Sequence, residues 1–108
     1  MGYKSLYKGI VFIEGDDSAA RLLGDVACDL SFRPGAQLKS LNDVKEELAQ
    51  ASASLGGNAV VRFTYGQKAR LLAWDDVAFW GKGAAAFLPA ETYNAYVAYI
   101  QERDGASR

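Results

Sequence analysis

The stretch from Ser40 to Gly56 constrains the fold more than any other part of the chain. Its apolar residues recur at spacings of three and four, the period of a helix with one buried face. These residues are Leu41, Val44, Leu48, Ala51 and Leu55. Ser40 is suited to cap the first turn, and the acidic Asp43 suits the positive end of the helix dipole. With Gly56-Gly57 as a left-handed stop, the pattern predicts a helix long enough to connect two pairs of strands.

Four strands are predicted around this helix. Tyr7 to Ile13 is short, β-branched and aromatic, and Gly24 to Arg33 alternates apolar and polar residues at period two. We expect these two strands to form an antiparallel hairpin. After the helix, Asn58 to Tyr65 has the composition of a strand. A second apolar strand, Val77 to Leu88, follows an irregular segment from Gly66 to Asp76.

Pro89 opens a final helix, because proline is well tolerated in a first helical turn. Its predicted buried face consists of Tyr93, Tyr96, Val97 and Ile100. The tail from 104 to 108 is expected to fray. The order of elements is therefore β-β-α-β-β-α, which predicts a single α+β domain over residues 1–108, with two layers and a mostly antiparallel sheet.

Composition excludes several classes of chemistry. The 108 residues contain no histidine and one cysteine, Cys28. No Ser-His-Asp triad, Cys-His pair, His-based zinc site or intrachain disulfide can form. Because Cys28 lies on the apolar face of its strand beside Val26 and Leu30, we interpret it as a buried structural thiol. We expect no cofactor and no tight zinc or copper site.

Charge and hydropathy give no reason to expect nucleic acid or membrane as a partner. Lys and Arg total 12 against 13 Asp and Glu. No stretch approaches the ~20 apolar residues of a membrane span, and the first residues lack the long apolar run of a signal peptide. We expect a cytoplasmic protein. The N-terminal Tyr3, Lys4, Tyr7 and Lys8 do not make a phosphate-tracking groove, so they indicate an extended segment with mixed faces.

Two short motifs are weak on their own. The run from Gly81 to Ala86 matches the G-x-G-x-x-A form of the dinucleotide fingerprint, but Pro89 interrupts any following helix. Its glycines more simply allow a close approach of neighbouring groups. Acidic pairs at 16–17 and 75–76 stand in expected turns, where adjacent carboxylates are usually solvated.

Apolar residues without an evident cover predict a homo-oligomer. The strand Val77 to Leu88 is apolar on both sides, whereas a strand in a two-layer domain should have one solvated face. Leu71, Leu72 and Trp74 add apolar surface in an expected loop, and we assign these three residues to a subunit interface. The final helix could cover part of this surface within one chain.

The run Leu55-Gly56-Gly57-Asn58-Ala59-Val60-Val61, followed by Arg62 and Tyr65, resembles the YbjQ-like family. These short bacterial proteins carry the label of a heavy-metal-binding domain and have no established reaction. Leu23-Gly24-Asp25-Val26 and Gly81-Lys82-Gly83-Ala84 are similar to an early and a late strand of the family, so the resemblance covers about Leu22 to Leu88. It implies an α+β subunit that assembles into a ring, a pentamer. The metal label finds no support in a chain without histidine.

The central motif also has a reading of its own. Gly56 and Gly57 end the helix, and Asn58 can bond loose backbone groups at the junction, so Gly56, Gly57, Asn58, Arg62 and Tyr65 specify the fold. We expect a non-enzymatic oligomer that binds a partner or small ligand at subunit interfaces. The alternative is a small enzyme that uses carboxylates, Asp25 and Asp75, with Arg62 as anion anchor.

Overall fold

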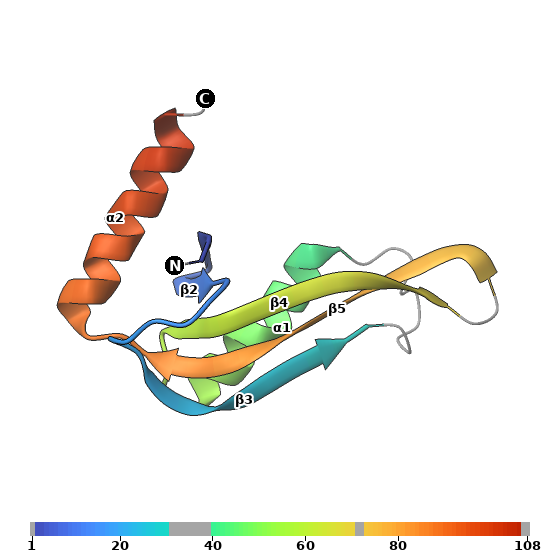
Figure 1. Cartoon of the computed structure of the whole chain (residues 1–108), viewed down its shortest axis with the longest axis horizontal. Helices are drawn as coiled ribbons and strands as arrows, with labels where there is room; N and C mark the ends of the chain where they lie inside the picture. Colours follow the sequence, from blue (N-terminus) through green and yellow to red (C-terminus); the bar gives the residue numbers. More distant parts are fainter. Residues whose placement is uncertain (1, 31–39, 71–72, 107–108) are drawn as a thin grey trace.

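A computed structural model describes residues 2–30, 40–70 and 73–106. Its elements are β1 (Lys4–Tyr7), β2 (Ile10–Ile13), β3 (Arg21–Asp29), α1 (Leu41–Ser54), β4 (Ala59–Arg70), β5 (Ala73–Phe87) and α2 (Ala90–Ala106). The strands form a sheet in the order β1-β2-β4-β5-β3, which is antiparallel except where β2 meets β4 (Figure 1). The predicted α+β class with a mostly antiparallel sheet is confirmed.

The first predicted strand is a hairpin rather than one strand. Lys8 and Gly9 both have positive φ, 48° and 83°, so they form a tight turn between β1 and β2. Such two-residue turns match the twist of the flanking strands. The signal is weak in the sequence because Lys, unlike Asn or Asp, seldom adopts positive φ. The chain therefore has one strand more than predicted.

The predicted hairpin between the first two strands is wrong. β3 pairs with β5 at the far edge of the sheet, and β2 pairs instead with β1 and β4. β3 and β4 both run antiparallel to β5, so they are parallel to each other. Parallel strands need a long crossover, and α1 provides it. The helix thus connects β3 to β4 across β5.

The prediction of an irregular segment from Gly66 to Asp76 is also wrong, because β4 and β5 extend into it. β4 continues to Arg70 and β5 begins at Ala73. Their pairing runs from Ala59↔Ala86 to Arg70↔Ala73, with irregularities between Val61 and Thr64 and between Ala69 and Arg70. Figure 1 shows this long hairpin extending well past α1.

The helix α1 is confirmed, and it packs on one face of the sheet. Val44 and Leu48 are fully buried, and Ser52 donates a hydrogen bond of 2.8 Å to the Ala59 carbonyl. The Asp43 carboxylate accepts from the Ser40 N–H at 2.7 Å. Leu55, predicted in the buried stripe, is 48% exposed because it lies beyond the end of the helix.

The opposite face of the sheet carries a second core under α2. Ile100 is buried there, with Tyr93, Tyr96 and Val97 partly buried against the same cluster, as the spacing of these residues predicts. α2 contacts β1 and β2. The predicted two layers are therefore extended by a third at this end of the sheet. α2 also continues to Ala106, through most of the tail that was expected to fray.

The glycines of the Gly81–Ala86 run lie where helix and strand side chains approach the sheet closely. A Cβ at Gly81 would come within 2.4 Å of a Val44 methyl, and one at Gly83 within 2.7 Å of a Val60 methyl. The run lies in the second half of β5 and opens no helix. Close packing, rather than a dinucleotide, accounts for these two glycines.

Candidate functional site

The residues Gly56, Gly57 and Asn58 join α1 to β4 and tie three strands together. Gly56 has φ of 86°, in the left-handed region that favours glycine. Asn58 lies beside Leu88: its side-chain amide donates to the Leu88 carbonyl at 3.0 Å, and its side-chain oxygen accepts from the Leu88 N–H at 2.8 Å. Its own carbonyl accepts from the Val11 N–H at 3.1 Å. Asn58 therefore holds β2, β4 and the end of β5 in register.

Asn58→Ala is expected to lower the free energy of unfolding by about 1–3 kcal/mol, because it leaves the backbone groups of buried Leu88 without partners. Asn58→Asp retains the acceptor and loses the donor, so its effect should be intermediate. Urea titration of the two variants measures this, with the exposed Asn94→Ala as a control. Equal stability of all three variants would contradict the role of Asn58 in holding these strands in register.

Arg62 and Tyr65 have different surroundings. Arg62 has φ of 54°, its N–H donates to the Gly15 carbonyl at 2.8 Å, and its side chain forms an ion pair with Asp16. The hydrogen bond to Asp16 raises the pKa of Arg62. Tyr65 is 43% exposed and stacks on Phe63 with 5.2 Å between ring centroids. Arg62 thus fixes the turn after β2, and its charge already has a partner.

The alternative hypothesis of an enzyme requires Asp25, Asp75 and Arg62 to meet at one site. The backbone does not bring all three together within one subunit. Asp25 pairs with Ala84 in the sheet, and Asp75 lies near the other end of β5. The separation along β5 from 75 to 84 is nine positions, or about 30 Å at the usual strand rise. Asp25 does lie close enough to Arg62 to contribute to its raised pKa. The backbone positions of Asp25 and Asp75 are therefore too far apart for one acid–base site within a subunit.

The predicted interface residues fall largely where the structure gives no description. Leu71 and Leu72 lie outside the described residues. Trp74 is in β5, which corrects its placement in a loop, but its side chain is outside the described part of the chain.

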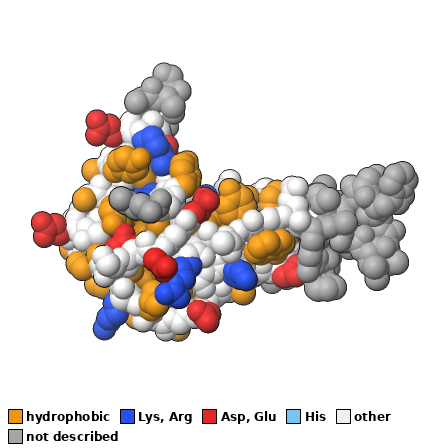
Figure 2. Space-filling model, viewed as in Figure 1, with side chains coloured by type: hydrophobic (Ala, Val, Ile, Leu, Met, Phe, Trp, Pro, Cys, Tyr) orange, Lys and Arg blue, Asp and Glu red, His pale blue; other side chains and the backbone are white. Residues whose placement is uncertain are grey.

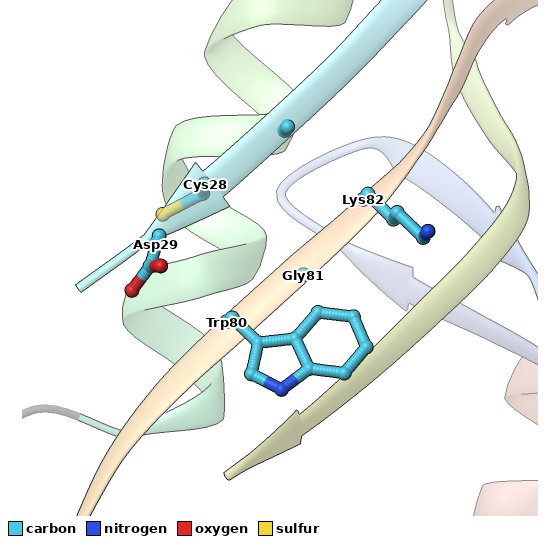
Figure 3. Close-up of a pocket in the computed structure, with 6 residues that line it drawn as sticks. Cys28, Asp29, Trp80, Gly81 and Lys82 are labelled. Carbon is cyan, nitrogen blue, oxygen red and sulfur yellow. The ribbon is translucent and has the colours of Figure 1, made fainter. Parts of the chain in front are cut away.

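Cys28 lies in a shallow hollow between β3 and β5. The hollow has a volume of about 410 Å³ and is lined by Ala27, Cys28, Asp29, Trp80, Gly81 and Lys82. Figure 3 shows Trp80 and Lys82 projecting to one side of β5, with Cys28 and Asp29 adjacent on β3. Cys28 is buried, as predicted, and its thiol donates to a Glu47 carboxylate oxygen at 2.9 Å from α1. The thiol therefore faces α1 rather than open solvent.

A second pocket lies between β1 and α2, and sequence reasoning missed it. Its volume is about 490 Å³ and it is lined by Gly2, Tyr3, Lys4, Tyr96, Tyr99 and Arg103. Lys4 is only 7% exposed, and its ammonium lies 4.8 Å from the centre of the Tyr96 ring. The Tyr96 hydroxyl donates to Asp17, which raises the pKa of Tyr96 to about 12. That hydroxyl stays protonated, so the ring remains neutral.

Arg103 connects this pocket to the edge of the sheet. The Glu14 N–H donates to the Tyr3 carbonyl at 2.9 Å, so by alternation the Lys4 carbonyl points away from β2. Arg103 donates to that outward carbonyl at 2.7 Å. Its guanidinium lies 4.5 Å from the Tyr3 ring centre and 5.8 Å from that of Tyr99. α2 thus covers part of the β1 edge.

The described residues contain neither a metal-holding cluster of acidic and thiol side chains nor a membrane-spanning helix. Among residues 2–30, 40–70 and 73–106, no group of three or more Cys, Asp or Glu side chains is arranged to hold a metal ion. In the same part of the chain, neither helix has the length and apolar character to cross a bilayer.

These features define a small α+β protein with an open sheet and shallow surface hollows. A crystal structure of a protein of unknown function from the DUF74 family, from Pediococcus pentosaceus ATCC 25745, is similar to it with a TM-score of 0.59. The likeness covers 76% of this chain and 100% of that one, at 11% sequence identity. DUF74 is the YbjQ-like family, so the sequence resemblance has a counterpart in the fold. No family model and no curated protein matches the chain.

Proposed function

We propose that the chain is a non-enzymatic subunit of a homo-oligomer, joined to its neighbours through the edge strand β3. In the described part of the chain, β3 pairs only with β5, so its other side is open. An unpaired edge is a template for pairing with another chain. A strand of nine residues is long for an unprotected edge, and β3 contains no proline. This open edge is the observation that carries the proposal.

The register indicates which backbone groups of β3 point outward. The Leu30 N–H donates to the Phe79 carbonyl at 3.0 Å, so Cys28 also faces β5 and Ala27 faces away from it. The Ala27 side chain is exposed as well. The N–H and carbonyl of Ala27 are therefore available to a strand of a second copy. The edge of β1 is less open, because Arg103 already occupies the Lys4 carbonyl.

Exposed apolar side chains gather where β3 begins. Leu22 is 47% exposed, and Phe87, across the sheet from Arg21, is 40% exposed. Leu55 is close by, since a Cβ at Gly24 would lie 3.5 Å from a Leu55 methyl. Apolar side chains from β3, β5 and the end of α1 beside an open edge favour burial by another subunit. The resemblance to YbjQ-like proteins favours a ring, a pentamer, as the assembly.

Ala27→Pro is expected to convert the oligomer to a monomer. Proline removes the outward N–H but no hydrogen bond to β5, and edge strands tolerate it for that reason. The matched control is Ala27→Thr, which keeps the N–H and should leave the assembly unchanged. Light scattering coupled to size exclusion measures the masses. A wild-type chain that elutes only at the 11.7 kDa monomer mass would overturn the proposal.

The proposed role is binding rather than catalysis. Asp25 of β3 pairs with Ala84, nine positions along β5 from Asp75, and the Cys28 thiol donates a hydrogen bond to the partly buried Glu47. Cys28 lines the first hollow, but its thiol donates to Glu47 of α1, and the second hollow is lined by basic and aromatic side chains and by Gly2. A small ligand or a protein partner held by the assembled subunits accounts better for such a surface.

A further inference from the structure

Lys4 occupies a position at which the strand pattern favours an apolar residue. Lys4 lies in β1, opposite Ile13 of β2. It is on the same face of the strand as Leu6, which packs against the core under α2. At 7% exposure it is one of two buried polar residues identified in the described chain, the other being Ser52. Ser52 donates a hydrogen bond to the Ala59 carbonyl. No hydrogen bond or ion pair joins the Lys4 ammonium to any described residue.

A buried ammonium without an anion or a hydrogen-bond acceptor is unfavourable. The Tyr96 ring face attracts the charge but compensates only part of the lost hydration. Asp17, the acid next to this ring, accepts the Tyr96 hydroxyl instead. The pocket therefore contains a positive charge that the described chain does not neutralise.

Arg103 adds a second cation to the same pocket. Its side chain is 26% exposed and is paired with Asp104 at 3.1 Å, so its charge is shared while that of Lys4 is not. The walls are aromatic: Tyr3 and Tyr99 flank the guanidinium, and both rings are more than half exposed. Figure 2 shows basic and hydrophobic side chains next to one another over the outer half of α2.

We infer that this pocket binds a small organic anion, with a carboxylate or phosphate group against Lys4 and Arg103 and a flat apolar body against the tyrosine rings. The volume of about 490 Å³ is within the usual range for small-molecule sites. Cationic side chains give their strongest hydrogen bonds to such anions. Tyrosine rings offer rigid contact area to a planar body. The site lies within one subunit, so it does not depend on the proposed assembly.

The test is calorimetry with four probes. Phenyl phosphate and benzoate carry the anion and the flat body, benzylamine carries the body with the opposite charge, and inorganic phosphate carries the anion alone. We expect phenyl phosphate or benzoate to bind with one site per chain, and benzylamine not to bind. Inorganic phosphate should bind more weakly than phenyl phosphate. If neither aromatic anion binds at millimolar concentration, or if inorganic phosphate binds as tightly, the inference is wrong.

Lys4→Met keeps the apolar stem of the side chain and removes its charge. It should weaken binding of the aromatic anion about 10- to 100-fold, the usual effect of losing one charge-assisted hydrogen bond. The matched control is Lys8→Met, in the exposed β1–β2 turn, which should leave binding unchanged. Equal weakening by both variants would indicate general charge attraction and would contradict a built site.

A measurement on the unaltered chain covers the case in which Lys4→Met does not fold. The ring resonances of Tyr96 and Tyr99 should shift on addition of phenyl phosphate. Tyr65, which stacks on Phe63 against the other core, is the internal control and should not shift. Shifts confined to other tyrosines would overturn the inference. The Ala27→Pro variant should show the same shifts, which separates this site from the fate of the assembly proposal.

Discussion

Leu48→Ala lowers the free energy of unfolding by about 2–5 kcal/mol, as expected for truncating a fully buried leucine. Leu48 is 0% exposed in the middle of α1 and packs over β5, where a Cβ at Gly81 would lie 3.5 Å from one of its methyl groups. Val44 already approaches Gly81 closely, so α1 has little room to move toward β5 and fill the cavity. Denaturant titration of the purified variant gives the value.

The matched control is Leu55→Ala, the same truncation one residue past the end of α1. Leu55 is 48% exposed, so its loss should cost less than about 1 kcal/mol. Both substitutions are made in the Ala27→Pro background, so that contacts between subunits do not contribute. Equal costs for the two substitutions would mean that the buried face of α1 has been assigned wrongly.

Gly57→Ala is expected to lower the free energy of unfolding by about 3 kcal/mol, the upper end of the usual cost of overpacking. A Cβ at Gly57 would lie 2.4 Å from the Ser52 hydroxyl oxygen and 2.7 Å from the Ala86 carbonyl oxygen. Neither atom is free to move, because Ser52 donates to the Ala59 carbonyl and the Ala86 carbonyl accepts from the Asn58 N–H. The junction between α1 and β4 must therefore open.

Gly105→Ala is the control for the same change in open space. No atom lies within 4 Å of a Cβ at that position in α2, and alanine favours a helix over glycine. Its thermal midpoint should be unchanged or slightly raised. A Gly57→Ala protein with the midpoint of the natural chain would show that the turn accommodates a side chain.

The sequence predicts those parts of the fold that depend on nearby residues. The period of three and four identifies α1 and the buried face of α2, and the Gly-Gly-Asn run marks the junction before β4. The predicted partner of β3 is wrong because the true pairing joins residues nearly sixty positions apart, such as Asp25↔Ala84. Alternation shows which face of a strand is apolar, but it does not show which strand lies beside it.

In the candidate sites too, features set by nearby residues could be predicted and those set by distant residues could not. The burial of Cys28 on an apolar face could be predicted from period two, whereas its partner Glu47 comes from α1. The pocket at Lys4 depends on Arg103, at a separation of 99 residues. One signal was present in the sequence: Lys4 and Leu6 alternate onto the same face of a strand. A lysine at that position indicates either a solvated edge or a buried charge.

The packing of α2 on β1, where Arg103 donates a hydrogen bond to the Lys4 carbonyl, has a consequence for biosynthesis. A chain emerges from the ribosome from its N-terminus, and local contacts can form as soon as both partners are outside. β1 and β2 emerge first among the described elements, but the helix that covers them emerges after the other six. Once β5 has emerged, α1 can pack over β3, β4 and β5 while the other face of the sheet is still without its helix. The second core therefore forms only after α2 has emerged, and a nascent chain stalled before residue 100 exposes that face to chaperones.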